Sequence, residues 1–120
     1  MTEYLYDTYA IMEIIGGNKN YNDYLGARVI INNFIFAELC FNLFKVKYPD
    51  AEIFLNKCKE FIVSIKPEVI KNAMKFRQDN KKKNLSMTDA ISYFQSKELG
   101  IKFLTGDKEF EHLDNVEFVK

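Results

Sequence analysis

The sequence predicts an α/β protein in which helices cover both faces of a mainly parallel sheet. Short β-branched or aromatic stretches alternate with longer segments whose apolar residues recur every three or four positions. Because parallel strands are joined by helical crossovers, this alternation favours a parallel sheet. A length of 120 residues and a hydrophobic fraction of 48% fit one folded domain over residues 1–120, with no repeat and no linker.

The elements follow one another closely along the chain. Strands are expected at 4–6, 28–31, 101–105 and 116–119, with 62–65 as a further strand or a frayed helix end. Helices are expected at 8–15, from Asn32 or Asn33 to about 47, at 51–61, from Pro67 to about Arg77, and from near Ser86 to 99. Residues 18–26 read as a loop or a short helical turn, and 109–113 as a helical turn.

Local signals set the helix ends in the first half. Gly16 and Gly17 end the first helix, and an asparagine at 32 or 33 caps the second. Pro49 closes that helix, and Asp50 is expected to cap the next one. These signals define the expected ends of the helices in the first half of the chain.

The second half contains the stretch around which the domain is organised. Pro67 fits the first turn of a helix, and the polar run DNKKKN at 79–84 follows that helix. The next helix has one apolar face, formed by Met87, Ala90, Ile91 and Phe94. Gly100 then provides the turn into the strand at 101–105.

Composition restricts the class of protein. The formal net charge is zero, from 17 basic and 17 acidic side chains, so no global field attracts nucleic acid. Cys40 and Cys58 lack metal-ligand spacing and are expected to be buried thiols in a reducing cytoplasm. We expect a soluble cytoplasmic protein, because residues 1–7 do not resemble a signal peptide and the apolar run 34–44 is too short to span a bilayer.

Three aspartates lie at predicted element ends. Asp7 and Asp107 each follow a strand, and Asp89 lies three residues after Ser86, in the spacing of a capping box. Each one taken singly is expected to cap a helix. Taken together they indicate a site, because strand ends that lead into helices share one edge of a parallel sheet. Clustered carboxylates repel one another without a cation, and oxygen donors favour Mg²⁺ or Mn²⁺ over Zn²⁺.

Glu38 is the only charged residue between Phe34 and Phe44. An unpaired carboxylate would be costly to bury in such an apolar helix. One interpretation is a narrow polar stripe, because Glu38, Asn42 and Lys45 fall at i, i+4 and i+7. The other is a metal ligand, and the three aspartates favour it. The predicted metal site therefore consists of Asp7, Glu38, Asp89 and Asp107.

The order of these acids resembles the PIN domain family. The segments that carry the resemblance are YLYDT, FAELC, MTDAISY and FLTGDKEF. The resemblance covers essentially the whole chain, and its length and closing stretch are similar to those of small members such as VapC-like toxins. It implies a three-layer α/β/α sandwich and a metal-dependent ribonuclease, the toxin of a toxin–antitoxin pair.

The resemblance also implies individual roles. It matches Asp7, Glu38 and Asp89 to the family's acidic triad and Asp107 to its fourth acid. Thr105 matches the Ser/Thr that often precedes the fourth acid by two residues. One or two Mg²⁺ or Mn²⁺ ions held there would bind the scissile phosphate of RNA and activate a water.

Two further features concern partners. The densest basic stretch contains Lys71, Lys75, Arg77, Lys81, Lys82 and Lys83. It reads either as a solvated helix end or as an arm that guides RNA phosphates toward an acidic site. The aromatic excess around one helix, with Phe34, Phe36, Phe41 and Phe44, indicates a homodimer surface or a groove for an antitoxin helix. Core packing is the simpler explanation for any single ring.

Two other functions fit less well. A receiver-type signalling domain has a similar length and an acidic pocket, but it needs paired acids after the first strand, where Asp7 stands alone. A PIN-like module that only binds RNA or protein would not need a complete set of acids.

Overall fold

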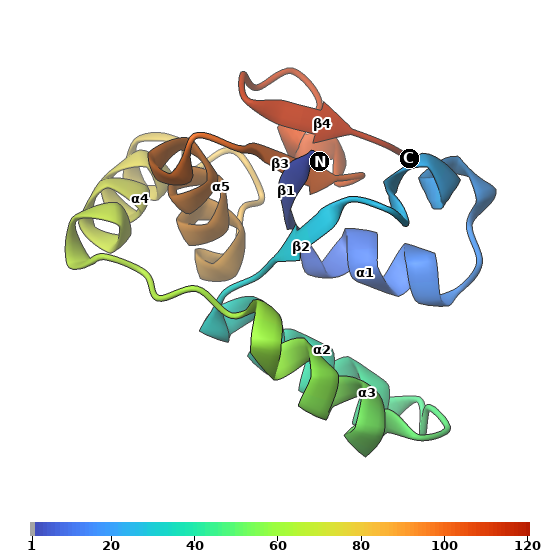
Figure 1. Ribbon diagram of the computed structural model, residues 1–120. Coiled ribbons are helices and arrows are strands. Elements are labelled where there is room, and N and C mark those ends of the chain that lie inside the picture. Colours follow the sequence, from blue (N-terminus) through green and yellow to red (C-terminus); the bar gives the residue numbers. More distant parts are fainter. Residues whose placement is uncertain (1) are drawn as a thin grey trace.

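A parallel sheet in the order β2-β1-β3-β4 forms the centre of the computed structural model, which describes residues 2–120 (Figure 1). Its strands are β1 (Glu3–Tyr6), β2 (Arg28–Ile30), β3 (Lys102–Thr105) and β4 (Val116–Phe118). The helices are α1 (Thr8–Ile15), α2 (Asn33–Lys45), α3 (Ala51–Cys58), α4 (Pro67–Asp79) and α5 (Met87–Leu99). Short 3-10 turns are η1 (Lys19–Tyr24), η2 (Lys59–Phe61) and η3 (Lys108–Phe110). Helices α4 and α5 lie on one side of the sheet and α1 on the other, which confirms the expected layered α/β fold.

The central strands β1 and β3 place the site. They pair in parallel, with Leu5 opposite Phe103 and Tyr6 opposite Leu104. The Asp7 N–H continues the ladder by donating to the Leu104 carbonyl at 2.9 Å. Leu5, Phe103 and Leu104 are fully buried in the main core. The first residue beyond β1 is therefore held rigidly at the carboxyl edge of the sheet.

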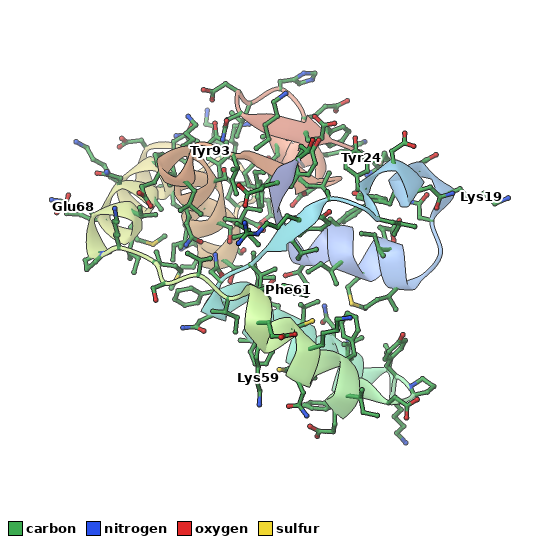
Figure 2. All side chains as sticks on the ribbon, in the orientation of Figure 1. Lys19, Tyr24, Lys59, Phe61, Glu68 and Tyr93 are labelled. Atoms are coloured by element: carbon green, nitrogen blue, oxygen red, sulfur yellow. The ribbon has the colours of Figure 1, made fainter. Side chains whose placement is uncertain are left out.

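Helices α2 and α3 form a hairpin that projects from the body of the molecule (Figure 1). Figure 2 shows Phe61 at the junction of this hairpin with the body and Lys59 on the outer side of the hairpin. The apolar side chains Leu39, Leu43 and Leu55 are buried and belong to the main core. The hairpin is thus an extension of that core.

Three predictions in this region are wrong in detail. Asp50 precedes α3 but makes no capping hydrogen bond with its side chain, because its backbone is left-handed with φ 59°. Residues 62–65 do not form a strand, and Ile62 makes only an isolated parallel bridge with Ile31. Cys58 is a buried free thiol as expected, but Cys40 is only half-buried.

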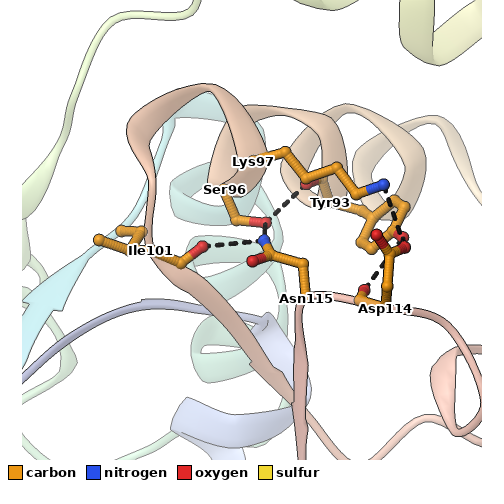
Figure 3. A network of polar contacts seen from close by, with 6 residues as sticks. All are labelled: Tyr93, Ser96, Lys97, Ile101, Asp114 and Asn115. Atoms are coloured by element: carbon orange, nitrogen blue, oxygen red, sulfur yellow. Dashed lines mark hydrogen bonds and ion pairs between the residues drawn. The ribbon is translucent and has the colours of Figure 1, made fainter.

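Helix α5 has well-defined ends. Ser86 and Asp89 form a capping box at its start, and Gly100 ends it in a left-handed conformation with φ 72°. Asn115 then ties its last turn to the chain before β4, by donating to the Ile101 carbonyl at 2.9 Å and to Ser96 Oγ at 3.2 Å (Figure 3). These contacts fix α5 against the strand that leads to the predicted fourth acid.

The Asp114 carboxylate provides a second tie at the same place. It accepts a hydrogen bond from the Tyr93 hydroxyl at 2.5 Å and pairs with Lys97 Nζ at 3.1 Å (Figure 3). The Lys97 ammonium also lies 4.7 Å from the centre of the Tyr93 ring.

All the helices within residues 2–120 are too short or too polar to cross a lipid bilayer.

Candidate acidic site at the carboxyl edge of the sheet

Asp7 is the most buried of the four predicted acids, with 4% of its surface exposed. It occupies the N-cap position of α1, yet its side chain makes no capping hydrogen bond. The Thr105 hydroxyl instead donates to Asp7 Oδ2 at 2.6 Å across two neighbouring strand ends. The interpretation of Asp7 as a helix cap is therefore wrong, and the carboxylate points along the sheet edge toward β3.

Glu38 lies half-buried in the middle of α2 and faces the start of α1. The Thr8 hydroxyl donates to Glu38 Oε1 at 2.6 Å. This contact gives the half-buried carboxylate a hydrogen-bond partner within the protein. Because Thr8 follows Asp7 directly, the contact also places Glu38 beside the end of β1.

Asp89 and Asp107 do cap helical turns, as each was expected to do singly. Asp89 Oδ2 accepts a hydrogen bond from the Ser86 N–H at 3.1 Å. Asp107 Oδ1 accepts one from the Glu109 N–H at 3.0 Å. The Asp107 N–H in turn donates to Thr105 Oγ at 3.1 Å, so the Thr105 hydroxyl connects two of the predicted acids. Both carboxylates are half-buried.

The other three carboxylates act electrostatically on Asp7. Burial is the largest cause that raises the pKa of Asp7, to about 7, and the charge of Asp89 is the next. The Thr105 hydrogen bond lowers this pKa, whereas the charges of Glu38 and Asp107 raise it further. Three acids that are distant in sequence therefore lie within electrostatic range of the buried Asp7 carboxylate.

The pKa of Asp89 is also raised. Burial is the main cause, and the charges of Asp107 and Glu38 add to it, against the opposing effect of the hydrogen bonds with Ser86. The raised pKa values of Asp7 and Asp89 mean that their ionisation destabilises the folded state at neutral pH unless a positive charge lies beside them.

The donor chemistry of this group fits a hard divalent cation. The described hydrogen bonds engage only one oxygen each of Asp7, Glu38 and Asp89, which leaves the other oxygen available. Within residues 2–120, however, no three His, Cys, Asp or Glu side chains converge closely enough to hold an ion as they stand. Charge coupling extends over several ångströms, whereas Mg²⁺–oxygen bonds are about 2.1 Å long. Coordination would therefore require rotation of these side chains toward a common point.

Sequence reasoning missed the residues that hold two of the acids in place. Thr8 was assigned no role, although a hydroxyl directly after a strand-ending aspartate is a possible signal. The fully buried Asn32 Nδ2 donates to Ser92 Oγ and Gln95 Oε1, both at 3.0 Å. These contacts join the start of α2, which contains Glu38, to α5. No local pattern in the sequence indicates that pairing.

The basic stretch does not form one uniform surface. Lys71 forms an ion pair with Glu68 at 3.2 Å on the exposed face of α4. Arg77 Nε donates to the Leu85 carbonyl at 2.9 Å, and Lys83 Nζ lies 3.4 Å from the Glu109 carbonyl. The remaining predicted RNA contacts, Lys75, Lys81 and Lys82, are exposed. Only the C-terminal part of the stretch thus adjoins the acidic edge.

The four phenylalanines of α2 fall into a partly buried pair and an exposed pair. Phe34 and Phe36 are partly buried and pack against core clusters. Phe41 is 68% exposed and Phe44 is 50% exposed. Core packing accounts for the first pair, and the second pair forms an apolar surface on the projecting hairpin.

Comparisons with known proteins agree with this description. The PIN domain family matches residues 4–116. No curated protein sequence matches the chain significantly. A solved toxin–antitoxin complex from Klebsiella pneumoniae has a TM-score of 0.77 at 20% identity, with 95% of each chain covered.

Two other solved structures have the same fold. VapC20 of Mycobacterium tuberculosis, a sarcin–ricin loop cleaving toxin, has a TM-score of 0.78 at 14% identity, with 99% of this chain and 100% of that chain covered. PAE2754 of Pyrobaculum aerophilum has a TM-score of 0.69 at 17% identity, with 98% of this chain and 89% of that chain covered.

Proposed function

The chain belongs to the PIN domain family, and from this premise we propose that it is a divalent-metal-dependent endoribonuclease that hydrolyses phosphodiester bonds of RNA. The observation that carries the proposal is the shared electrostatic environment of Asp7, Glu38, Asp89 and Asp107. Grouped acids at the carboxyl edge of a parallel sheet, two of which (Asp7 and Asp89) have raised pKa values, are typical of a functional site rather than of a stabilising one.

The proposed roles follow from the position of each acid. Asp7 and Asp89 would contact Mg²⁺ or Mn²⁺ directly, Glu38 would contact it or orient a water, and Asp107 would act through a water. When bound, such an ion lowers the pKa of a bound water and stabilises charge on the leaving oxygen. Thr105 would orient the carboxylate of Asp7 by holding its Oδ2.

Two alternatives make different predictions. A PIN-like module that only binds RNA or protein would keep the fold without cutting RNA. The absence of three converging ligands within residues 2–120 is the observation that favours this alternative. A receiver-type domain is not supported, because the family match covers residues 4–116.

We also propose that the protein is the toxin of a toxin–antitoxin pair and forms a homodimer. Two solved structures of the same fold, a toxin–antitoxin complex and a sarcin–ricin loop cleaving toxin, support the toxin assignment. A protein partner would cover apolar surface such as Phe41 and Phe44. It could also occupy the apolar cleft of about 290 Å³ whose walls include Ile11, Phe54 and Phe61.

An RNA cleavage assay tests the proposed activity. The wild-type protein should cut single-stranded RNA in Mg²⁺ or Mn²⁺ and should be inactive in EDTA. Asp89→Asn keeps the size of the side chain but removes a charge, so we expect its cleavage rate to fall by about 100-fold or more. Asp50→Asn is the matched control, because Asp50 is exposed and makes no capping hydrogen bond with its side chain. Cleavage by Asp89→Asn at the wild-type rate would contradict the proposal.

A further inference from the structure

A polar cleft of about 320 Å³ lies between the end of α4 and the start of α5. The residues that line it are Arg77, Gln78, Lys81, Lys83, Asn84 and Leu85. Three of them are cationic, none is acidic, and all except Leu85 are polar. The cleft is therefore suited to an anion rather than to an apolar ligand.

Arg77 is held in place at one wall of this cleft. Its Nε donates to the Leu85 carbonyl at 2.9 Å, so one edge of the guanidinium is used by the protein. Among the described residues, no carboxylate forms an ion pair with Arg77, Lys81 or Lys83. The two terminal nitrogens of Arg77 thus remain available to an outside ligand. Because the guanidinium is planar, these nitrogens can bind two oxygens of one phosphate.

The cleft adjoins the acidic site. Leu85 directly precedes Ser86, which caps the helix that contains Asp89. On the other side, Lys83 Nζ lies 3.4 Å from the carbonyl of Glu109, two residues beyond Asp107. A strand of RNA with one phosphate at the carboxylates would therefore present neighbouring phosphates to this cleft.

We propose that the cleft binds a backbone phosphate of the RNA other than the scissile one. Arg77 contacts this phosphate through its two terminal nitrogens, and Lys81 and Lys83 surround it with positive charge. The inference rests on the proposed function only in taking RNA as the substrate. Arg77 would contact two oxygens of one phosphate, whereas a general basic surface would need only positive charge.

RNA binding measured by fluorescence anisotropy in EDTA, where no cleavage is expected, tests the assignment. The probes are single-stranded RNA oligonucleotides in which one phosphate at a time is replaced by an uncharged methylphosphonate. For the wild type, one non-scissile position should weaken binding by about fivefold to twentyfold. Arg77→Gln should bind the unmodified RNA more weakly by a similar factor, and replacement at that position should have no further effect on it.

Three variants make the test specific. Arg77→Lys keeps the charge but not the two-nitrogen contact, so it should recover less than half of the lost binding free energy. Lys81→Gln does not disturb the Arg77–Leu85 contact, and it should reduce the slope of log Kd against log salt by about 0.7. Lys57→Gln, on the projecting hairpin, is the matched control and should bind as the wild type does. Circular dichroism should establish that each variant is folded.

The outcomes separate this inference from the proposed activity. If the wild type cuts RNA in Mg²⁺ but no phosphate position depends on Arg77, the inference is wrong and the proposed function stands. Full recovery by Arg77→Lys would also overturn it, because a general positive charge would then be sufficient. If the wild type neither binds nor cuts RNA, both are wrong.

Discussion

At the scale of single residues, Asp7 has the least favourable environment among the acids of the site. Its carboxylate is buried, is near three other acids and receives one hydrogen bond from the Thr105 hydroxyl. Its pKa is about 7 in the folded protein against an ordinary value of 3.8. In the absence of a cation, ionisation of Asp7 therefore opposes folding.

This environment predicts that Asp7→Asn stabilises the metal-free protein. The asparagine Oδ1 can still accept the Thr105 hydrogen bond, but the buried charge is removed. The rise of the Asp7 pKa from 3.8 to about 7, at about 1.4 kcal/mol per unit, corresponds to a gain in the free energy of unfolding on the order of 4 kcal/mol above pH 7. Urea unfolding in EDTA at pH 8 measures this gain.

The same effect has a defined pH dependence. Between pH 7 and pH 3.8 the folded state of the wild type binds a proton at Asp7 more tightly than the unfolded state does. The stabilising contribution of this proton is complete below 3.8 and is lost as the pH rises through 7. The difference between Asp7→Asn and the wild type should thus decrease from pH 8 to pH 5. A difference that stays constant, or a destabilised variant, would contradict this account of Asp7.

The sequence predicted which acids form the candidate site better than it predicted the hydrogen-bond partners of their side chains. Asp89 and Asp107 could be recognised as caps because the hydrogen-bonded groups lie within three residues. For Asp7 the local pattern was misleading, since its side-chain partner Thr105 is 98 positions away. Thr8 was missed for the same reason, because its acceptor Glu38 lies on another helix.

At the scale of elements, the arrangement of the site depends on how α2 is held against α5. Asn32 caps α2 by accepting a hydrogen bond from the Ile35 N–H, while its amide donates to Ser92 and Gln95. Gln95 Nε2 then donates to the Ser64 carbonyl at 3.2 Å. One buried network thus joins the helix that contains Glu38, the helix that contains Asp89 and the segment before α4.

The network predicts that Gln95→Leu is destabilising. Leucine fills a similar volume but leaves the amide of Asn32 with one partner fewer in a fully buried position. We expect the free energy of unfolding to fall by about 1–3 kcal/mol, measured by urea denaturation. Gln78→Leu on the exposed end of α4 is the control and should change stability by less than about 0.5 kcal/mol. Equal stability of the two variants would show that the network does not hold α2 and α5 together.

Element boundaries could be predicted where the local chemistry is strong. The ends of α1 and the capping box and Gly100 of α5 were correct because each depends on backbone and side-chain groups near in sequence. For 62–65 the sequence left a strand and a frayed helix end open, and the structure has an isolated bridge at Ile62 beyond the end of η2. Asp50 has the composition of a cap but a left-handed backbone. The backbone conformation at these two places depends on tertiary contacts that the sequence alone does not show.

At the scale of the whole molecule, the fold brings together groups from four distant segments. Parallel pairing of β1 with β3 places Asp7 and Thr105 at one sheet edge, while α2 and α5 bring Glu38 and Asp89 to it. The layered α/β fold could be predicted because helical segments separate the short strands β1, β2 and β3 along the chain. The distances between the four carboxylates could not, since they depend on helix packing. Their assignment as metal ligands stays a prediction.

Direct measurement of Mn²⁺ binding, by isothermal titration calorimetry at pH 8, tests the central claim that these acids jointly hold a divalent cation. We predict that the wild type and Asp50→Asn bind Mn²⁺ with the same affinity. Asp7→Asn, Glu38→Gln and Asp89→Asn should each bind it at least about tenfold more weakly while remaining folded. Undiminished binding by all three variants, or no binding by the wild type, would contradict the claim.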